Sequence, residues 1–480
     1  MRAFPVAAAI ALSLASQWSH AQPVPLGLKL APSIDLDSAS VRPRMIPAAG
    51  GNASQVFPHS RLSDLVARAV ERSQLMVAAA AQVRGGEAGI DQARALMRPN
   101  VSAQARAGRA TLDNSTLIQL GDTSTGASSG AANYRQLALT LSMPVLRMQS
   151  GPEQQAAEET RNAARSRLDE VRLDLTLKVV DAYLQAARLE GEMDSLRAEK
   201  QLLERQLALH ERRMGAGVAT MVDVLETRAR LADLEVQFEI TGASAQAQRL
   251  ELARLTAGPI PVVAPLRSDL AFPELDATEA SASLSAQSGN PGLQRARAEF
   301  LAAESRARAQ RAQGLPAVNL AARVDQSRTE GFTPTRTAPN GDVSLSVNVP
   351  LGLDGLNSAQ QRQALAEADR LRAVADDLVQ TIQTSISVAY SDHARARAQE
   401  RARKASAEIA AQALEMTQRA FVAGIRSNID VLNAERQLAD AERELVRVRT
   451  TVLSAHARIL ALTGTIDAET LKKWDQLFRQ

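Results

Sequence analysis

Hydrophobic and polar residues alternate one by one in four short stretches of the chain. These stretches are Val101–Ala107, Leu137–Met143, Val318–Val324 and Val343–Val349. A period of two is typical of a β-strand with one apolar and one polar face. The first pair of stretches and the second pair each predict a β-hairpin, within residues 99–144 and 316–350.

A period of seven follows each predicted hairpin and is typical of helices that pack along a narrow seam. In the first half its positions are Leu168, Leu175, Ala182, Leu189, Leu196 and Leu203, then Val224, Leu231, Phe238, Ala245 and Leu252. In the second half they are Val431, Leu438, Leu445, Val452 and Ile459. We therefore expect long helices over residues 153–217, 221–257, 358–424 and 428–463.

A turn between the long helices occurs twice in the sequence. Gly217 precedes Asp223 as Gly424 precedes Asp430, and each aspartate is followed by Val-Leu. The two aspartates stand 207 residues apart, and so do the Leu-Thr pairs that begin at Leu255 and Leu462. A repeat of this length indicates a duplicated structural unit.

The repeat divides the chain into segments. Each copy reads helix, hairpin, long helix, tight turn, helix, over residues 61–258 and 291–464. In the first copy, the opening helical pattern continues to Met97 and is weakened at Gly85-Gly86. Residues 259–290 are rich in Pro, Ser and Ala and are interpreted as a connecting segment, and residues 465–480 as a tail with a short helix.

The N-terminal residues predict export from the cytoplasm. Arg2, a short apolar run and Ser19-His20-Ala21 match a secretory signal peptide over residues 1–21. Residues 22–60, rich in Pro, Ser and Ala without a period, are interpreted as an extended arm. An N-terminal membrane anchor is the weaker alternative, because the apolar run is shorter than the ~20 residues that span a bilayer.

Composition argues against several classes of function. Aromatic residues make up only 3% of the chain, which favours long helices over a thick globular core. The net charge is +3, with no basic stripe that would predict a nucleic-acid partner. The five histidines are scattered and there is no cysteine, so we expect no metal and no cofactor. No nucleophile elbow or phosphate loop indicates an enzyme.

Two hairpins provide only four strands, and an open four-stranded sheet has unpaired edges. Closure through several subunits would remove those edges, and closure is required in lipid, which cannot hydrogen-bond to the backbone. Apolar residues facing lipid and polar residues facing a wet lumen would explain the alternation. A soluble sandwich with its apolar face in a core is the alternative.

The layout resembles the outer-membrane efflux protein family, the TolC-like channel-tunnels, over nearly the whole mature chain. The Gly-x5-Asp turns, the Asp430-Val-Leu432 run and the Leu-Thr helix ends carry this resemblance. It implies a mainly α fold with β: a trimeric channel-tunnel with a shared transmembrane β-barrel, four strands per subunit, and a long periplasmic coiled-coil α-barrel. It also implies an outer-membrane location, a periplasmic adaptor and an inner-membrane pump.

The resemblance also assigns a periplasmic gate to the turns at Gly217 and Gly424. Asp430 matches an acidic ring position, and Asn433 stands where a second acid is found. Arg426 and Asp223 match positions that link neighbouring hairpins in the closed state. Phe421 replaces a hydrogen-bonding tyrosine.

A simpler interpretation exists for both aspartates. Thr220-x-x-Asp223 and Ser427-x-x-Asp430 have the spacing of a capping box, in which the side chains satisfy backbone groups at a helix start. We favour this interpretation for Asp223. For Asp430 the cap and the gate remain open alternatives.

These observations predict a passive outer-membrane exit duct that is opened by partners and powered elsewhere. Type I secretion of an unfolded protein is favoured, since the chain lacks the cysteine that anchors many drug-efflux members to lipid. Multidrug or metal efflux is the alternative. A periplasmic coiled-coil scaffold that conducts nothing is the alternative from another class.

Overall fold

The fold is described from a computed structural model of the whole chain. The described residues are 60–112, 130–216, 220–267, 272–275, 277–330, 336–351 and 355–479. The predicted signal peptide at 1–21 and the arm at 22–60 therefore lie outside the described residues, Ser60 apart.

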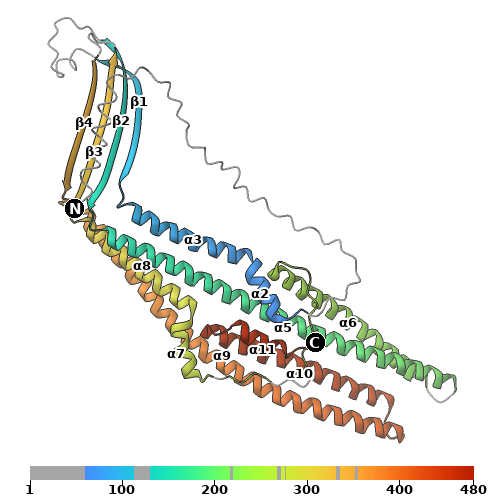
Figure 1. Cartoon of the computed structure of the whole chain (residues 1–480). Coiled ribbons are helices and arrows are strands. Elements are labelled where there is room, and N and C mark those ends of the chain that lie inside the picture. Colours follow the sequence, from blue (N-terminus) through green and yellow to red (C-terminus); the bar gives the residue numbers. More distant parts are fainter. Residues whose placement is uncertain are drawn as a thin grey trace. The chain divides into compact units, whose positions relative to one another are not determined.

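The same order of helices and strands occurs in both halves of the chain, and one further helix ends the second half (Figure 1). The first half contains α2 (Leu62–Arg72), α3 (Gln74–Ala95), β1 (Asn100–Leu112), β2 (Gly130–Leu146), α5 (Ser150–Gly215) and α6 (Met221–Thr256). The second contains α7 (Glu279–Gly289), α8 (Pro291–Gln313), β3 (Ala317–Glu330), β4 (Arg336–Asn348), α9 (Leu356–Val422), α10 (Asn428–Thr463) and α11 (Ala468–Asp475). A mainly α fold with β, built from a duplicated unit, is thus confirmed.

The strands form one antiparallel sheet in the order β1-β2-β3-β4. The central pair joins the two halves of the chain, with Leu139 opposite Val324. Apolar residues of the alternation are exposed, among them Leu139 at 49% and Leu345 at 65%, whereas Ala138, next to Leu139, is buried. The sheet therefore presents an apolar surface that the described part of this chain leaves uncovered.

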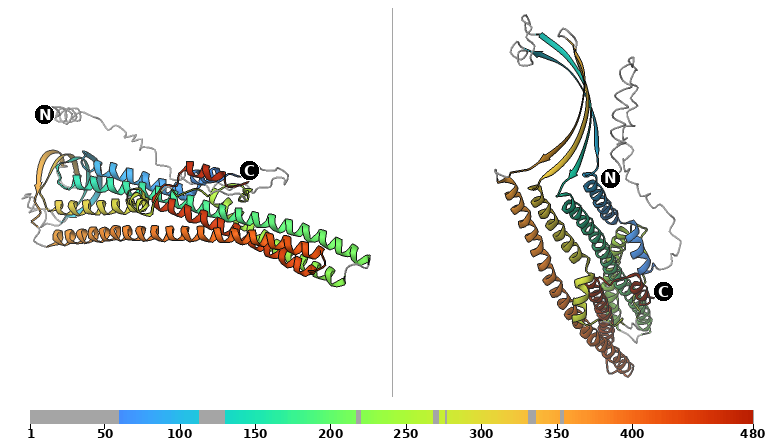
Figure 2. Two further views of the ribbon diagram at one scale, coloured as in Figure 1. Left: turned by 90° about the horizontal axis from the view of Figure 1, so that it is seen from below. Right: turned by 60° about the vertical axis from the view of Figure 1, so that its left-hand side comes forward.

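The long helices lie side by side in pairs (Figure 2). α5 packs against α3, α6, α8 and α10, and α9 packs against α8 and α10. The seven-residue seam of α5 is buried at every position from Leu175 to Leu203, and it extends one more step to His210. Leu196 and Leu203 meet Leu234 of α6 and Leu432 of α10 in one cluster, so the seam joins both helical hairpins.

The N-terminal helical stretch breaks at Ser73 and not at the glycines. Ser73 lies between α2 and α3, and its hydroxyl accepts a hydrogen bond from the Leu75 amide at 3.2 Å. Gly85 and Gly86 remain inside α3. A Cβ at Gly86 would lie 2.9 Å from the Arg161 Cα, so the missing side chain permits α3 to approach α5 closely.

The segments between and after the repeats also pack against the helices. α7 occupies part of the connecting segment, where the sequence patterns predict no helix. In the tail, the short helix expected within residues 465–480 is α11, whose Trp474 is buried. Asp475 of this helix accepts a hydrogen bond from the Ser63 hydroxyl at 2.5 Å, and Phe478 stacks edge-on against Tyr183 of α5. These contacts fasten the end of the described chain to α2 and α5.

Candidate functional site

The two turns between the long helices end in the same local structure. At the start of α10, the Ser427 hydroxyl accepts from the Asp430 amide at 3.4 Å, and the Asp430 carboxylate accepts from the Ser427 amide at 2.9 Å. At the start of α6, Thr220 and Asp223 make the same pair of bonds at 3.3 and 2.9 Å. Each aspartate thus satisfies backbone groups that a helix start leaves unpaired.

These bonds lower the pKa of both carboxyl groups. For Asp430 the main cause is the hydrogen bond from the Ser427 backbone, followed by the one from its hydroxyl. For Asp223 the Thr220 hydroxyl contributes most and the Thr220 backbone next. Both groups are therefore negatively charged at neutral pH, and neither could act as a proton donor there.

The second turn depends on a backbone conformation suited to glycine. Gly424 has φ +75°, in the left-handed region that residues with a Cβ rarely adopt. Its amide donates to the Phe421 carbonyl at 2.9 Å, and the Ile425 amide donates to the Ala420 carbonyl at 2.9 Å. Gly217, assigned to the first turn, lies outside the described residues.

The structure brings Arg426 and Asp430 together within one turn. The Arg426 guanidinium lies 3.6 Å from the Asp430 carboxylate of the same chain, and both side chains are more than a third exposed. Asn433 is exposed one turn further along α10, and Phe421 is half-buried near the end of α9. A link from Arg426 or Asp223 to a neighbouring hairpin in the closed state stays a prediction.

Asp223 and Asp430 are not in direct contact. Among the described residues, no hydrogen bond or ion pair connects the turn before α6 with the turn before α10. One chain therefore presents two separate capped turns. A ring of Asp430 carboxylates would require several copies of the chain.

The turns also carry exposed apolar side chains that the sequence patterns did not single out. Val422 is 87% exposed and Ile425 77%, on either side of Gly424. Met221 and Val222, at the start of α6, are 55% and 58% exposed. The sequence does contain a signal for them, because they are apolar residues beside a glycine turn that do not belong to the seven-residue period. Each turn thus presents exposed apolar side chains, as surfaces that contact another protein often do.

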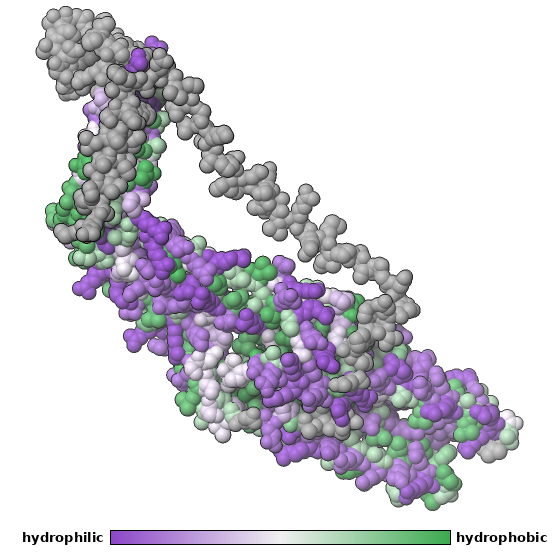
Figure 3. Space-filling view, viewed as in Figure 1, coloured by the Kyte–Doolittle hydropathy of each residue, from purple (hydrophilic) through white to green (hydrophobic). Residues whose placement is uncertain are grey.

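The molecular surface differs between the strands and the helices. In Figure 3, hydrophobic residues gather over the visible part of the strands, and hydrophilic residues dominate the helices. No helix in the described part of the chain is both long enough and apolar enough to cross a membrane.

Tertiary structure brings two of the scattered histidines together. The rings of His393 and His456 lie 5.7 Å apart, and His456 packs against Trp474 at 5.6 Å. Across the described ranges, no group of three or more histidine, aspartate or glutamate side chains could hold a metal ion.

Comparisons with known proteins agree with this architecture. The outer membrane efflux protein family model matches residues 65–258 and 283–465, more than half of the chain. Alkaline protease secretion protein AprF of Pseudomonas aeruginosa is 28% identical over 304 residues, which are 62% of this chain and 63% of AprF. Outer membrane efflux protein BepC of Brucella suis is 27% identical over 321 residues, 65% of this chain and 70% of BepC. The chain thus aligns with less than two thirds of AprF.

A solved structure extends the likeness to the fold. The outer membrane protein VceC from Vibrio cholerae superimposes with a TM-score of 0.69 at 20% identity, over 84% of this chain and 96% of VceC. This likeness shows a shared fold. The family match places the chain in the outer membrane, among channels and not among enzymes. The chain belongs to the outer membrane efflux protein family.

Proposed function

We propose that this chain is a passive exit duct of a tripartite export system. Three copies would share one barrel and one helical tunnel. The duct would dock onto a periplasmic adaptor protein and be powered by an inner-membrane ABC transporter or another pump. We further propose that it exports a protein by type I secretion.

One observation supports the duct above others: the four-stranded sheet is open and apolar on its surface. Within the described residues, β1 pairs only with β2 and β4 only with β3. Val343 and Val347 on the edge strand β4 are 77% and 61% exposed. Unpaired edges and exposed apolar side chains are both removed when further copies close the sheet inside lipid.

The turns support the docking of a partner. Val422 and Ile425 are exposed at the turn that carries the charged Arg426 and Asp430, and Met221 and Val222 are exposed at the other turn. An apolar centre with a polar rim is the usual composition of a protein–protein interface. The proposed adaptor would cover these exposed apolar side chains.

The relatives support two cargoes. AprF is by name a protease secretion protein, which favours the export of a protein. BepC is by name an efflux protein, and it keeps multidrug or metal efflux as the second candidate.

Electrophoresis without heating and recordings in planar bilayers test the duct. We expect a heat-dissociable oligomer of three chains that forms discrete conductance steps when reconstituted. A monomer that stays soluble without detergent and conducts nothing would instead support a periplasmic coiled-coil scaffold.

Replacement of a known outer-membrane component tests the cargo. The chain would be expressed in a bacterium that has a protease, its ABC exporter and its adaptor but lacks their outer-membrane partner. We expect the protease to reappear in the medium. If secretion stays absent while a strain lacking an efflux channel regains drug or metal resistance, the efflux candidate replaces type I secretion.

A further inference from the structure

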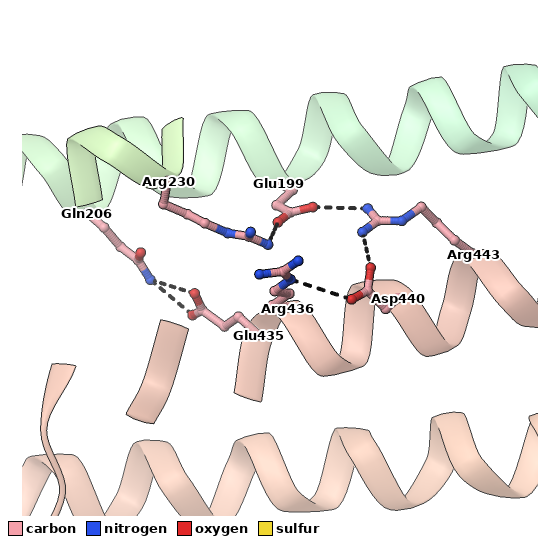
Figure 4. A network of polar contacts seen from close by, with 7 residues as sticks. All are labelled: Glu199, Gln206, Arg230, Glu435, Arg436, Asp440 and Arg443. Carbon is pink, nitrogen blue, oxygen red and sulfur yellow. Dashed lines mark hydrogen bonds and ion pairs between the residues drawn. The ribbon is translucent and has the colours of Figure 1, made fainter. Parts of the chain in front are cut away.

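A carboxyl–amide pair connects the two helical hairpins near the start of α10. Gln206 of α5 donates from its Nε2 atom to both carboxyl oxygens of Glu435 on α10, at 2.9 and 3.1 Å (Figure 4). The two residues are 229 positions apart in the sequence. This pair therefore belongs to the contact between the hairpins α5–α6 and α9–α10.

The pair leaves one polar atom of Gln206 without a partner. Both hydrogen bonds use the same nitrogen, and the Gln206 Oε1 atom is buried with no hydrogen-bond partner among the described residues. An ionised carboxylate has no proton to donate to this oxygen. A buried acceptor without a donor destabilises the arrangement that contains it.

The cations near Glu435 are engaged by other acids. Arg230 of α6 and Arg443 of α10 each lie 3.1 Å from Glu199 of α5. The Arg443 guanidinium also lies 2.6 Å from the Asp440 carboxylate, and the Arg436 guanidinium lies 3.7 Å from the same carboxylate. None of the ion pairs within the described ranges includes Glu435. Figure 4 shows the arginines pointing toward Glu199 and Asp440.

None of the remaining neighbours within the described ranges forms an ion pair with Glu435. Gln418 of α9, which lies near Glu435, is uncharged. Within one turn of Gln418 on α9, the charged residues are Glu415 and Arg419. Both are exposed, and they pair with each other. On α5, the next titratable side chain toward the turn is His210, which is buried.

These surroundings raise the pKa of Glu435. Burial is the largest cause, and the negative charge of Glu199 adds to it, while the hydrogen bonds from Gln206 and Gln418 oppose it. A carboxyl group with a raised pKa holds its proton more tightly in the folded than in the unfolded chain. Its stabilising effect is therefore complete below about the ordinary value of 4.5 and is lost as the pH rises through the raised value.

We propose that Gln206 and Glu435 form a contact between the hairpins that acid strengthens. When Glu435 is protonated, its O–H donates to Gln206 Oε1, while Gln206 Nε2 donates to the other carboxyl oxygen. The amide and the carboxylic acid then make two opposed hydrogen bonds, and the buried oxygen is no longer unpaired. If the chain is the proposed duct, this contact makes the α9–α10 hairpin harder to separate from α5–α6 in acid.

Hydrogen exchange of the intact, detergent-solubilised protein tests the contact without requiring transport. Glu435→Gln mimics the protonated side chain at every pH. At pH 7.5 the backbone amides around positions 206 and 435 should exchange more slowly in the variant than in wild type. The difference should be about tenfold for each unit by which the pKa of Glu435 in the folded chain exceeds its pKa in the unfolded chain. The difference should vanish as the pH falls toward 4.5, the ordinary value.

Two further variants separate this contact from a general effect of charge. Asp440→Asn removes a nearby carboxylate. Any difference in protection between this variant and wild type at pH 7.5 should persist when the pH is lowered to 4.5. Gln206→Met removes the amide and should reduce the acid-induced protection, leaving only the part that the burial of Glu435 causes. Equal or lower protection in Glu435→Gln than in wild type at pH 7.5 would overturn the proposal, whether or not the protein conducts ions. An acid response in Gln206→Met as large as that in wild type would do the same.

Discussion

At the scale of single residues, Asp430 has a demonstrated structural role and a predicted functional one. Its carboxylate caps α10 through Ser427, and it lies 3.6 Å from the Arg426 guanidinium. The gate role stays a prediction, because it requires several Asp430 side chains to converge. Asp223 makes the same cap on α6, and no ion pair among the described residues includes it, so it is a matched control.

Asp430→Asn should weaken cation preference in single-channel recordings while trimers still assemble. If three copies converge, they focus the field in a constriction, and a neutral side chain removes that field. Asp223→Asn should leave ion selectivity unchanged. The capping interpretation predicts unchanged conductance in both variants, so identical selectivity in wild type and Asp430→Asn would eliminate the gate.

Gly424→Ala should destabilise the second turn through backbone conformation alone. A Cβ at this position meets no atom within 4 Å, but φ +75° is unfavourable for alanine, by about 1–2 kcal/mol. Gly215→Ala is the control, because a Cβ there also meets nothing within 4 Å and the residue ends a helix. Thermal unfolding should separate the two variants. Equal midpoints would show that the left-handed conformation imposes no penalty.

At the scale of elements, the seam of α5 unites both helical hairpins. Leu196 is 1% exposed and Leu203 2%, and both pack against α6 and α10. Glu199, which stands between these two leucines on α5, is largely shielded from solvent and pairs with Arg230 of α6 and Arg443 of α10. Apolar and charged contacts to the same two helices thus coincide along one stretch of α5.

Leu196→Ala should destabilise the helical part by ~2–5 kcal/mol, because it removes a buried side chain and leaves a cavity. Leu189→Ala, at a position 6% exposed, should do the same. Leu209→Ala is the control on the same helix, since Leu209 is 43% exposed and lies off the seam. Chemical unfolding followed by circular dichroism measures the three variants. Unchanged unfolding of both seam variants would contradict the packing.

At the scale of the whole molecule, the sheet requires an environment that one chain does not supply. Its exposed apolar residues lie on strands whose outer edges are unpaired within the described residues. Closure by further copies within lipid would satisfy both the edges and the apolar side chains.

Leu345→Arg should impair insertion and assembly. If position 345 lies near the bilayer midplane, the substitution should destabilise the inserted barrel by about 2–4 kcal/mol. Leu139→Arg on β2 should behave in the same way. Ser344→Arg is the control, because adjacent residues of a strand point to opposite faces and position 344 would face the lumen. The fraction of heat-dissociable oligomer in outer-membrane preparations measures the effect. Wild-type assembly of both leucine variants would contradict the lipid-facing assignment.

The sequence by itself determined the features that depend on neighbouring residues. Strand alternation and the seven-residue seam follow from the local geometry of strands and helices, so the order of residues alone predicts both. The capping boxes also require only four consecutive residues, as at Ser427 to Asp430. The duplicated order of elements followed from the repetition of these local patterns.

Only the tertiary structure decided which distant residues meet. Gly85 and Gly86 remain inside α3, which packs closely on α5 at Gly86, and such packing can override weak helix propensity. Gln206 and Glu435 are 229 positions apart, and no local pattern distinguishes this glutamate from the exposed acids around it. Its environment arises because α5 and α10 lie side by side, and burial and hydrogen bonding between helices depend on the whole packed structure.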